Sequence, residues 1–455
     1  MTATPRQGRL TLEHLRHGMQ SGELHTVVVA MADMQGRLQG KRMAIAHFLA
    51  DVAQGEAEGC LYQLATDIDM NTVEGYRHGS WATGYGDFLF VPDLDTLRRL
   101  PWHPGSALVM CDLAWADHAP VAVSPRQILR GQIERLEALG LTALAAAELE
   151  FILFRESFAE AWHKGYRDLT PATRYNVDYS LLDTDNLEPL MCRLRNEMRA
   201  AGLNPLESKG ECNFGQHEIT FRYADALQAA DNHAIYKHGA KEIAAQEGYS
   251  VTYMAKFNER EGSSCHIHMS LRAEDGSPVM AEGDRLSTLG ERFVAGLLAN
   301  LRELTLFFAP NINSYKRFAS SSFAPTRIAW GRDNRTCALR LVGHQAPALR
   351  IENRVPGGDV NPYLALAAMI AAGLDGIERE LTLEAPCQGN AYLGDGPRVP
   401  SHLLEARQLF ADSSLARAAF GDEVVAHYLN MADIEIDAFF SAVTDWERRR
   451  GFERM

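Results

Sequence analysis

The alternation of apolar and polar residues along the chain predicts interleaved strands and helices. Apolar runs typical of strands lie at 27–31, 107–113, 142–154, 217–223, 250–255 and 264–272. Apolar residues recur at helical spacing in 12–20, 124–139, 183–202, 223–247, 287–309, 362–380 and most of 401–450. Residues 36–42 are typical of a turn or hairpin, and 327–355 of arginine-rich strands. Because some strands look hairpin-connected, the pattern favours an α+β fold over a strictly parallel sheet.

A change in composition near 116–124 divides this pattern into two parts. The first part is small and rich in strands and loops. In the second part, longer helices interleave with strands. We therefore predict an N-terminal domain over residues 1–118 and a larger C-terminal domain over residues 119–455.

Composition narrows the class of protein. A net charge of -14 argues against a nucleic-acid partner, because no basic excess is present to neutralise phosphates. The polar stretch 1–10 has no apolar segment of a secretory signal, and no run of about eighteen apolar residues predicts a membrane span. The seven cysteines are scattered without a Cys-x-x-Cys pair, which favours a reduced, cytoplasmic location.

Four stretches place chemically active side chains two residues apart. They read Glu148-Leu149-Glu150, Gln216-His217-Glu218, His266-Ile267-His268 and Arg350-Ile351-Glu352-Asn353-Arg354. In a strand, residues i and i+2 point to the same face, so each stretch would present its polar groups together. The neighbouring residues are mostly apolar and suit the opposite, core-facing side. A sheet of this kind is suited to holding metal ions and phosphates.

Each group also has a simpler structural explanation. Glu148 and Glu150 could line a solvated strand edge, but burial inside an apolar run is costly unless carboxylates are paired or metal-bound. Glu211 and Glu218 flank a turn, where charged residues are usually solvated. Of the two histidines at 266 and 268, one could be a core histidine; two on one face favour a metal ligand or a phosphate contact.

The side-chain types select the kind of ligand. Several carboxylates with one or two imidazoles and no thiolate favour Mg²⁺ or Mn²⁺ over structural zinc. Arginine guanidinium groups match the geometry of phosphates and carboxylates. A cluster of them lies within forty residues: Arg317, Arg332, Arg335, Arg340, Arg350 and Arg354. Surface arginine clusters are usually solvated, but several of these lie in apolar, strand-like contexts, which favours a functional role.

Taken in order, these motifs resemble the glutamine synthetase family, in particular its bacterial type I branch, over nearly the whole chain. The segments that carry the resemblance are AAELEFILF, ECNFGQHEITFRYADA, EGSSCHIHMSL, NSYKRF, DNRTCALRLV and ALRIENRVPGGDVNPY. The resemblance implies a small β-grasp-like N-terminal domain and a catalytic domain with a curved antiparallel sheet surrounded by helices. It also implies a homo-oligomer, a dodecamer of two hexameric rings, with each site between neighbouring subunits.

The resemblance further implies roles for individual residues. Metal ligands for two to three Mg²⁺ or Mn²⁺ ions would be Glu148, Glu150, Glu211, Glu218, His266 and Glu352. ATP and its phosphates would contact Glu207, His268, Ser270, Arg335, Arg340 and Arg350. Glutamate and the second substrate would contact Glu150, Gly262, Arg317, Phe323 and Arg354. Asp67, Arg335 and Arg354 would act in catalysis, with Asp69 as the alternative to Asp67 for handling the amine.

The activity implied is an ATP-dependent ligation. The γ-carboxylate of glutamate takes the γ-phosphoryl group of ATP, and an amine then displaces phosphate from γ-glutamyl phosphate. Three positions depart from the family pattern. Phe323, in Ser320-Ser321-Ser322-Phe323-Ala324-Pro325, replaces a flap glutamate that binds ammonium. Glu261 replaces an asparagine near the substrate glutamate. Tyr392 lies near the family's adenylylation tyrosine, but its flanking residues differ, and that control is not predicted.

A phenyl ring cannot bind a cation through charge or accept a proton, but it packs against carbon. We therefore expect a γ-glutamyl-amine ligase that uses a small organic amine, with ethanolamine as the expected substrate. Polyamine or alkylamine ligases and a true glutamine synthetase are the alternatives. A non-catalytic structural homologue would be free to lose metal ligands, yet the ligand candidates are all present. A further alternative is some other two-metal phosphotransferase. Release of ADP that depends on glutamate would distinguish the γ-glutamyl-amine ligase from it.

Overall fold

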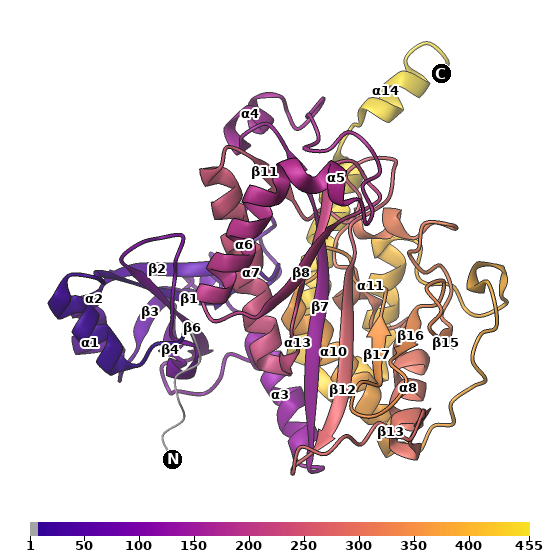
Figure 1. The fold of residues 1–455 in the computed structure, drawn as a ribbon, viewed down its shortest axis with the longest axis horizontal. Coiled ribbons are helices and arrows are strands. Elements are labelled where there is room, and N and C mark those ends of the chain that lie inside the picture. Colours follow the sequence, from indigo (N-terminus) through magenta and orange to yellow (C-terminus); the bar gives the residue numbers. More distant parts are fainter. Residues whose placement is uncertain (1–7) are drawn as a thin grey trace.

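The computed structural model describes residues 8–455, whose strands form two main sheets in successive parts of the chain (Figure 1). Residues 1–7, which hold most of the polar N-terminal stretch, lie outside the described part. In Figure 1 the N-terminal sheet forms a lobe at one side of the larger, helix-covered catalytic sheet. Within residues 8–455, no helix is long and apolar enough to cross a membrane.

The N-terminal sheet has the order β2-β1-β6-β4-β3, and β5 pairs with β6. β1 and β6 run parallel, whereas the other pairs are antiparallel. The elements are α1 (Leu12–Ser21), β1 (Thr26–Ala32), β2 (Leu38–Ala44), α2 (Ile45–His47), β3 (Ala57–Cys60), β4 (Asp87–Pro92), β5 (Arg98–Arg99) and β6 (Ser106–Ala114). This small mixed sheet is the predicted N-terminal lobe.

The turn predicted at 36–42 is misplaced. The chain turns at 33–37, where the Asp33 carboxylate accepts the amides of Gln35 and Arg37 at 3.0 and 2.8 Å. The residues after Leu38 form the edge strand β2, paired with β1. Polar residues such as Lys41 are compatible with an exposed edge strand. Their polarity concealed the strand in the sequence.

The catalytic sheet has the order β15-β16-β17-β12-β7-β9-β8, with β10 and β11 also paired to β7. Its pairs are antiparallel except β15 with β16. The strands are β7 (Leu141–Phe154), β8 (Pro205–Gly210), β9 (Gln216–Phe221), β10 (Ala224–Asp225), β11 (Ser250–Thr252), β12 (Cys265–Ala273), β15 (Trp330–Arg332), β16 (Leu339–Val342) and β17 (Arg350–Asn353). The predicted antiparallel sheet and α+β class are confirmed.

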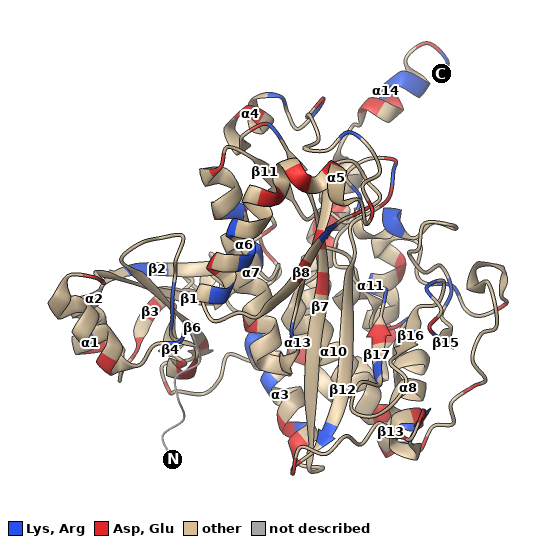
Figure 2. Ribbon diagram, viewed as in Figure 1, with Lys and Arg blue, Asp and Glu red and all other residues tan. Residues whose placement is uncertain are grey.

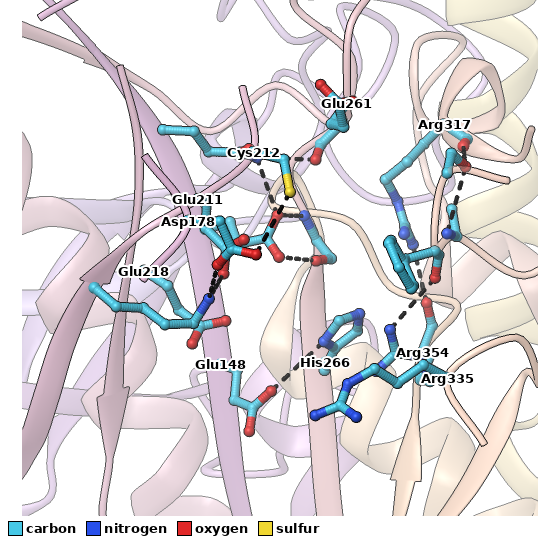
Figure 3. A pocket seen from close by; sticks show the side chains of 18 of the residues that line it. Glu148, Asp178, Glu211, Cys212, Glu218, Glu261, His266, Arg317, Arg335 and Arg354 are labelled. Atoms are coloured by element: carbon cyan, nitrogen blue, oxygen red, sulfur yellow. Dashed lines mark hydrogen bonds and ion pairs between the residues drawn. The ribbon is translucent and has the colours of Figure 1, made fainter. Parts of the chain in front are cut away.

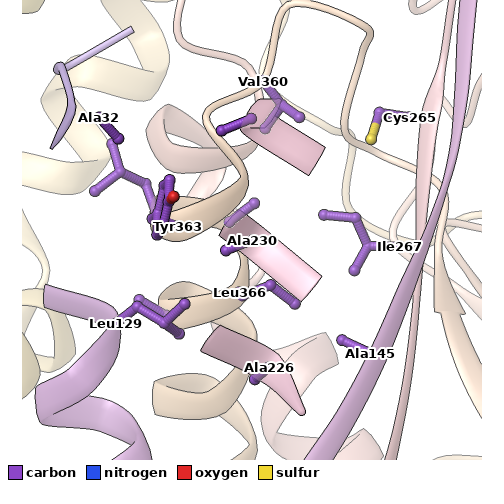
Figure 4. Packing of buried hydrophobic residues seen from close by; sticks show 14 of the residues in the cluster. Ala32, Leu129, Ala145, Ala226, Ala230, Cys265, Ile267, Val360, Tyr363 and Leu366 are labelled. Atoms are coloured by element: carbon purple, nitrogen blue, oxygen red, sulfur yellow. The ribbon is translucent and has the colours of Figure 1, made fainter. Parts of the chain in front are cut away.

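Helices cover one face of this sheet and bury its apolar residues. Ala145 of β7 and Ile267 of β12 face Ala226 and Ala230 of α7 and Leu366 of α10 (Figure 4). The helices of this layer and its surroundings are α3 (Pro125–Glu137), α7 (Ala226–Gln246), α8 (Thr288–Asn300), α9 (Thr305–Phe308) and α10 (Pro362–Glu378). Their small residues allow close packing, which fixes the sheet that carries the polar side chains.

The remaining helices enclose the ends of the sheet. They are α4 (Phe158–His163), α5 (Leu181–Thr184), α6 (Glu188–Ala200), α11 (Leu403–Asp412), α12 (Ser414–Phe420), α13 (Asp422–Ser441) and α14 (Asp445–Gly451). The helix predicted at 183–202 begins later, at α6, where Pro189 occupies the first turn. The single helix predicted at 287–309 is broken into α8 and α9. At the break, the side-chain amide of Asn300 donates to Gly296 O and to Asp375 Oδ2, each at 2.9 Å. The residues of the turn that follows include buried leucines, which stabilise it.

A buried ionic network joins the two parts of the chain. The guanidinium of Arg126, on α3, lies 2.5 Å from Asp112 and 2.6 Å from Asp93 of the N-terminal part, and 2.9 Å from Asp231 of α7. Tyr363 donates to the same Asp231 at 2.7 Å. The predicted division at 118/119 falls in the connection between β6 and α3 and stays a prediction.

Candidate active site

A cavity of about 450 Å³ opens beside the end of the catalytic sheet. Most of the predicted site residues line it: Glu148, Glu150, Glu207, Glu211, Glu218, Gly262, His266, Arg317, Phe323, Arg335, Arg340 and Arg354. Figure 3 shows carboxylates on one side of this cavity, Arg317, Arg335 and Arg354 on the other, and His266 between them. The fold therefore brings together residues that are up to about 200 positions apart in the chain.

Strand register explains why these side chains share one face. Glu148 is the cross-strand partner of His266, and Glu150 that of Glu218. Partners across an antiparallel pair point to the same side of the sheet. The alternating residues Leu149 and Ile267 point to the other side and are buried in the core. Figure 2 shows acidic residues on β7 and β17, whereas most of β12 is uncharged.

One group of carboxylates consists of Glu150, Glu211 and Glu218, whose oxygens lie within 4.8 Å of one another. Glu150 accepts Gln216 Nε2 at 3.1 Å and Ser264 N at 2.8 Å, which fixes its orientation. Burial and the neighbouring carboxylates raise the pKa of Glu218 to about 9. Burial and the charge of Glu150 raise the pKa of Glu211 to about 7. A divalent cation would relieve this repulsion, so the group fits a hard metal ion.

A second group is formed by Glu148, His268 and Glu352, again within 4.8 Å. The Nδ1 atom of His266 lies 3.5 Å from both Glu148 Oε2 and Glu352 Oε1. Burial and the charge of Arg354 lower the pKa of His266, which keeps its imidazole neutral and able to bind a metal. The structure thus places both predicted histidines beside the same carboxylates.

The protonation of His268 follows from its two partners. Arg350 Nε donates to His268 Nδ1 at 3.1 Å, so the histidine proton lies on Nε2, 2.9 Å from Glu148 Oε1. Burial alone would raise the pKa of Glu148, but hydrogen bonds from His266 and His268 more than offset it. The pKa of Glu148 therefore lies well below its ordinary value, and the carboxylate is ionised. Arg350 reaches this group without lining the cavity itself.

Arginines surround the fully buried carboxylate of Glu352. Arg340 Nη1 donates to it at 3.0 Å and Arg354 Nη1 at 2.5 Å. Burial would raise the pKa of Glu352, but the neighbouring side chains of His266, Arg354 and His268 hold it below the ordinary value. Arg332, counted in the predicted arginine cluster, instead contacts the carbonyls of Gly343 and Asp284 away from the cavity. Arg332 lies at the exposed end of the edge strand β15, so its side chain does not join the arginines at the cavity.

Arg317 is buried beside the glycine predicted to contact substrate. Its Nη2 atom donates to the carbonyls of Arg354 and Pro356 at 3.1 and 2.9 Å. Burial lowers the pKa of Arg317 to about 10, so it remains a cation near pH 7. A Cβ atom on Gly262 would meet Arg317 Cγ at 2.6 Å. Only glycine allows the loop to approach this arginine so closely.

Phe323 lines the cavity from the flap, defined here as residues 319–325. Its side chain is 59% exposed, and its backbone has a left-handed φ of 57°. Arg354 Nη2 donates to its carbonyl at 3.3 Å. The flap residue thus contacts the same arginine that holds Glu352.

Several cavity residues were missed by the sequence reasoning. Lys209 contacts Asp178 and Glu211 and lies 4.5 Å from the centre of the Tyr179 ring. Lys209 alternates with Glu207 and Glu211 in the sequence, and this spacing could have identified it as a residue on the same face. Cys212, Gln216 and Ser264 also line the cavity. Gln216 belongs to one of the four alternating stretches in the sequence, but no role was predicted for it.

Other predicted residues lie outside the cavity lining. Asp67 is in a loop of the N-terminal part, where its carboxylate accepts Asn71 N at 2.8 Å. Asp69 belongs to the same loop. Ser270 lies on β12 opposite Leu144, two positions beyond His268. Their predicted roles stay predictions.

The carboxylate groups, neutral imidazole and opposing arginines define a site for metal-assisted chemistry on a phosphorylated, acidic substrate. The chain matches the family "Glutamine synthetase, catalytic domain" over residues 122–451. It therefore belongs to the glutamine synthetase family, whose members use ATP and divalent metal ions. The predicted family, fold and ligase class are confirmed.

Individual relatives refine this comparison. The chain is 60% identical to gamma-glutamylethanolamide synthetase GlnA4 of Streptomyces coelicolor, over 98% of this chain and 96% of that protein. It is 38% identical to glutamate–isopropylamine ligase of a Pseudomonas species, over 96% of both chains. The solved structure "Apo GmaS without ligand" superposes with a TM-score of 0.83 at 25% identity, covering 96% of this chain and 99% of the other. The prediction of a glutamate–amine ligase is confirmed by these relatives.

Proposed function

We propose that this enzyme joins the γ-carboxylate of glutamate to ethanolamine, forming γ-glutamylethanolamide with hydrolysis of ATP. The observation that carries the proposal is Phe323, an apolar ring lining the cavity where the family has an ammonium-binding glutamate. A ring at this position packs against the carbon atoms of an organic amine. It has no negative charge with which to bind the ammonium cation. The gamma-glutamylethanolamide synthetase relative supports the choice of ethanolamine.

The carboxylate groups would hold two to three Mg²⁺ or Mn²⁺ ions. The first group contributes Glu150, Glu211 and Glu218. The second contributes Glu148 and Glu352, with His266 beside both carboxylates as the imidazole ligand. Bound ions would neutralise phosphate charge, which is the main task in phosphoryl transfer. The donor set of oxygens and imidazole, without an engaged thiolate, supports this choice of metal.

The arginines of this chain bind and orient the anionic groups. Arg317 would pair with the carboxylate of glutamate, beside Gly262 and Glu150. ATP and its phosphates would contact Glu207, His268, Ser270, Arg335, Arg340 and Arg350. Holding the γ-carboxylate in line with the γ-phosphorus lowers the entropic cost of the first step. Arg335 and Arg354 would stabilise charge on the transferred phosphoryl group and then on the departing phosphate.

The second step is attack of the amine on γ-glutamyl phosphate. The nitrogen forms the amide bond, phosphate leaves, and the proton lost from nitrogen passes to a carboxylate. We assign that carboxylate to Asp67, with Asp69 as the alternative. Both lie outside the cavity lining of their own chain. They would therefore serve the site of a neighbouring subunit.

That arrangement requires a homo-oligomer, for which we propose two stacked hexameric rings. Large apolar side chains are exposed on the single chain at Leu181, Leu182, Trp446 and Phe452. Contiguous exposed apolar surface is typical of subunit contacts. In Figure 1 the terminal helix α14 projects from the body of the chain, as an element that packs on another subunit would. Light scattering coupled to gel filtration measures the subunit number.

The test is phosphate release from ATP with Mg²⁺, glutamate and a panel of amines: ammonium, ethanolamine, methylamine, putrescine, spermine and aniline. Reactions without glutamate and with the Glu218→Gln variant serve as controls. Ethanolamine should give the highest kcat/KM, and mass spectrometry should identify γ-glutamylethanolamide. Preference for ammonium would make the protein a true glutamine synthetase. Preference for another amine would identify that amine as the substrate in place of ethanolamine. If no amine stimulates phosphate release by the folded, assembled protein, the ligase assignment is contradicted.

A further inference from the structure

The flap that carries Phe323 has a backbone that its own sequence does not favour. Ser321 and Phe323 have φ values of 62° and 57°. The left-handed conformation is unfavourable for residues other than glycine, because Cβ then lies too close to the following carbonyl oxygen. The flap therefore depends on contacts from outside it to hold this shape.

Two side chains from distant segments supply those contacts. Arg354 donates to the carbonyl of Phe323 at 3.3 Å, as described above. The hydroxyl of Tyr392 donates to the carbonyl of the next residue, Ala324, at 3.1 Å. Ala324 is only 3% exposed, so its carbonyl has little access to water as a substitute. Loss of the hydrogen bond from Tyr392 would leave this buried acceptor unsatisfied, which destabilises the flap.

Tyr392 is itself firmly anchored. It belongs to a short turn in which Asn390 Oδ1 accepts the Tyr392 amide at 3.0 Å. The Ala391 amide donates to Thr336 Oγ1 at 2.9 Å, and Asn334 Nδ2 donates to Gly389 O at 2.8 Å. The turn is thus fixed to the loop that contains Arg335. A hydrogen bond from this turn can hold the flap in place.

We propose that Tyr392 is a positioning residue that holds Phe323 at the cavity and so sets the selectivity of the enzyme for its amine. The inference rests on the proposed function for its effect on selectivity. Tyr392 does not line the cavity, and it acts only through the flap. The role requires the hydroxyl group, because the aromatic ring alone cannot donate to Ala324.

The first measurement is hydrogen–deuterium exchange of the flap amides in the Tyr392→Phe variant, which removes the hydroxyl alone. Exchange of residues 319–325 should become at least about fivefold faster, in keeping with one lost hydrogen bond, while the core helix α10 remains unchanged. Tyr223→Phe, at an exposed tyrosine, is the matched control. Unchanged flap exchange would overturn the proposal, whatever the substrate of the enzyme.

The second measurement compares the Michaelis constants of the three substrates. Tyr392→Phe should raise KM for the amine about 5- to 10-fold and leave KM for glutamate and ATP within about twofold of wild type. In a Phe323→Ala background, the Tyr392→Phe change should have no further effect on the amine, because its action passes through the ring. Equal changes for all substrates, or additive effects in the double variant, would show a general structural role instead. A wild-type enzyme without amine response would contradict the proposed function, and the exchange result would still decide the role of Tyr392.

Discussion

Glu150 and Glu218 are direct cross-strand partners on β7 and β9, with both carboxylates on the same face of the sheet. Like charges directly opposed across strands are destabilising. A protein that buries such a pair, with Glu211 added to it, is arranged for a cation rather than for the stability of the metal-free fold.

Glu218→Gln should remove a metal ligand and one charge of the repelling group. We expect kcat/KM to fall about 100-fold or more, because metal sites are sensitive to the loss of one ligand. The metal-free variant should melt at a higher temperature than metal-free wild type. Steady-state phosphate release and thermal unfolding measure these effects, with the exposed Glu291→Gln as control. Retention of full activity would show that Glu218 is not a ligand.

The stability of the metal-free protein should fall as pH rises. Glu211 and Glu218 have folded pKa values of about 7 and about 9, above their ordinary value of 4.5. Between these values the native state binds more protons than the unfolded state, so stability present below about pH 4.5 is lost as pH rises toward 9. Mg²⁺ should offset this loss, and its effect on the melting temperature should be larger at pH 8.5 than at pH 6. An Mg²⁺ effect independent of pH would contradict the assignment.

Phe323→Glu should bring ammonium activity to the enzyme. A carboxylate at the cavity would bind ammonium and accept its proton, which should raise the ratio of ammonium to ethanolamine kcat/KM about 100-fold. Phe323→Leu, which keeps an apolar side chain, should retain the preference for ethanolamine. If both variants behave alike, the substitution acts through packing of the flap and not through charge.

Arg126→Met should lower the free energy of unfolding by about 3–5 kcal/mol. The change leaves the buried carboxylate of Asp231 without the guanidinium group that pairs with it. Arg130→Met is the matched control, since Arg130 lies on the same helix and contacts Asp93 and Asp112 but is partly exposed. Its effect should be smaller. Denaturant unfolding measures the free energy of unfolding of both variants. Equal losses of that free energy would show that burial of Arg126 does not increase its contribution to stability.

Much of the site was predictable because its signals are local. Glu148 with Glu150, and His266 with His268, alternate along single strands, and this period of two places them on one face whatever the rest of the fold. The apolar residues between them predicted the buried side of the sheet. The predicted boundaries of some helices differ from the structure. One example is Asn300, where a side-chain contact with Asp375 helps end α8. Such contacts leave no local pattern.

The sequence by itself therefore determined the class of fold, the family and most of the residues that line the cavity, because alternation and motif order are properties of neighbouring positions. Only the tertiary structure decided which residues meet. It paired Glu150 with Glu218, placed Lys209 beside Glu211, and brought Tyr392 to the flap. Cross-strand register and loop docking depend on packing between distant segments, and that packing sets the distances and pKa values through which the site acts.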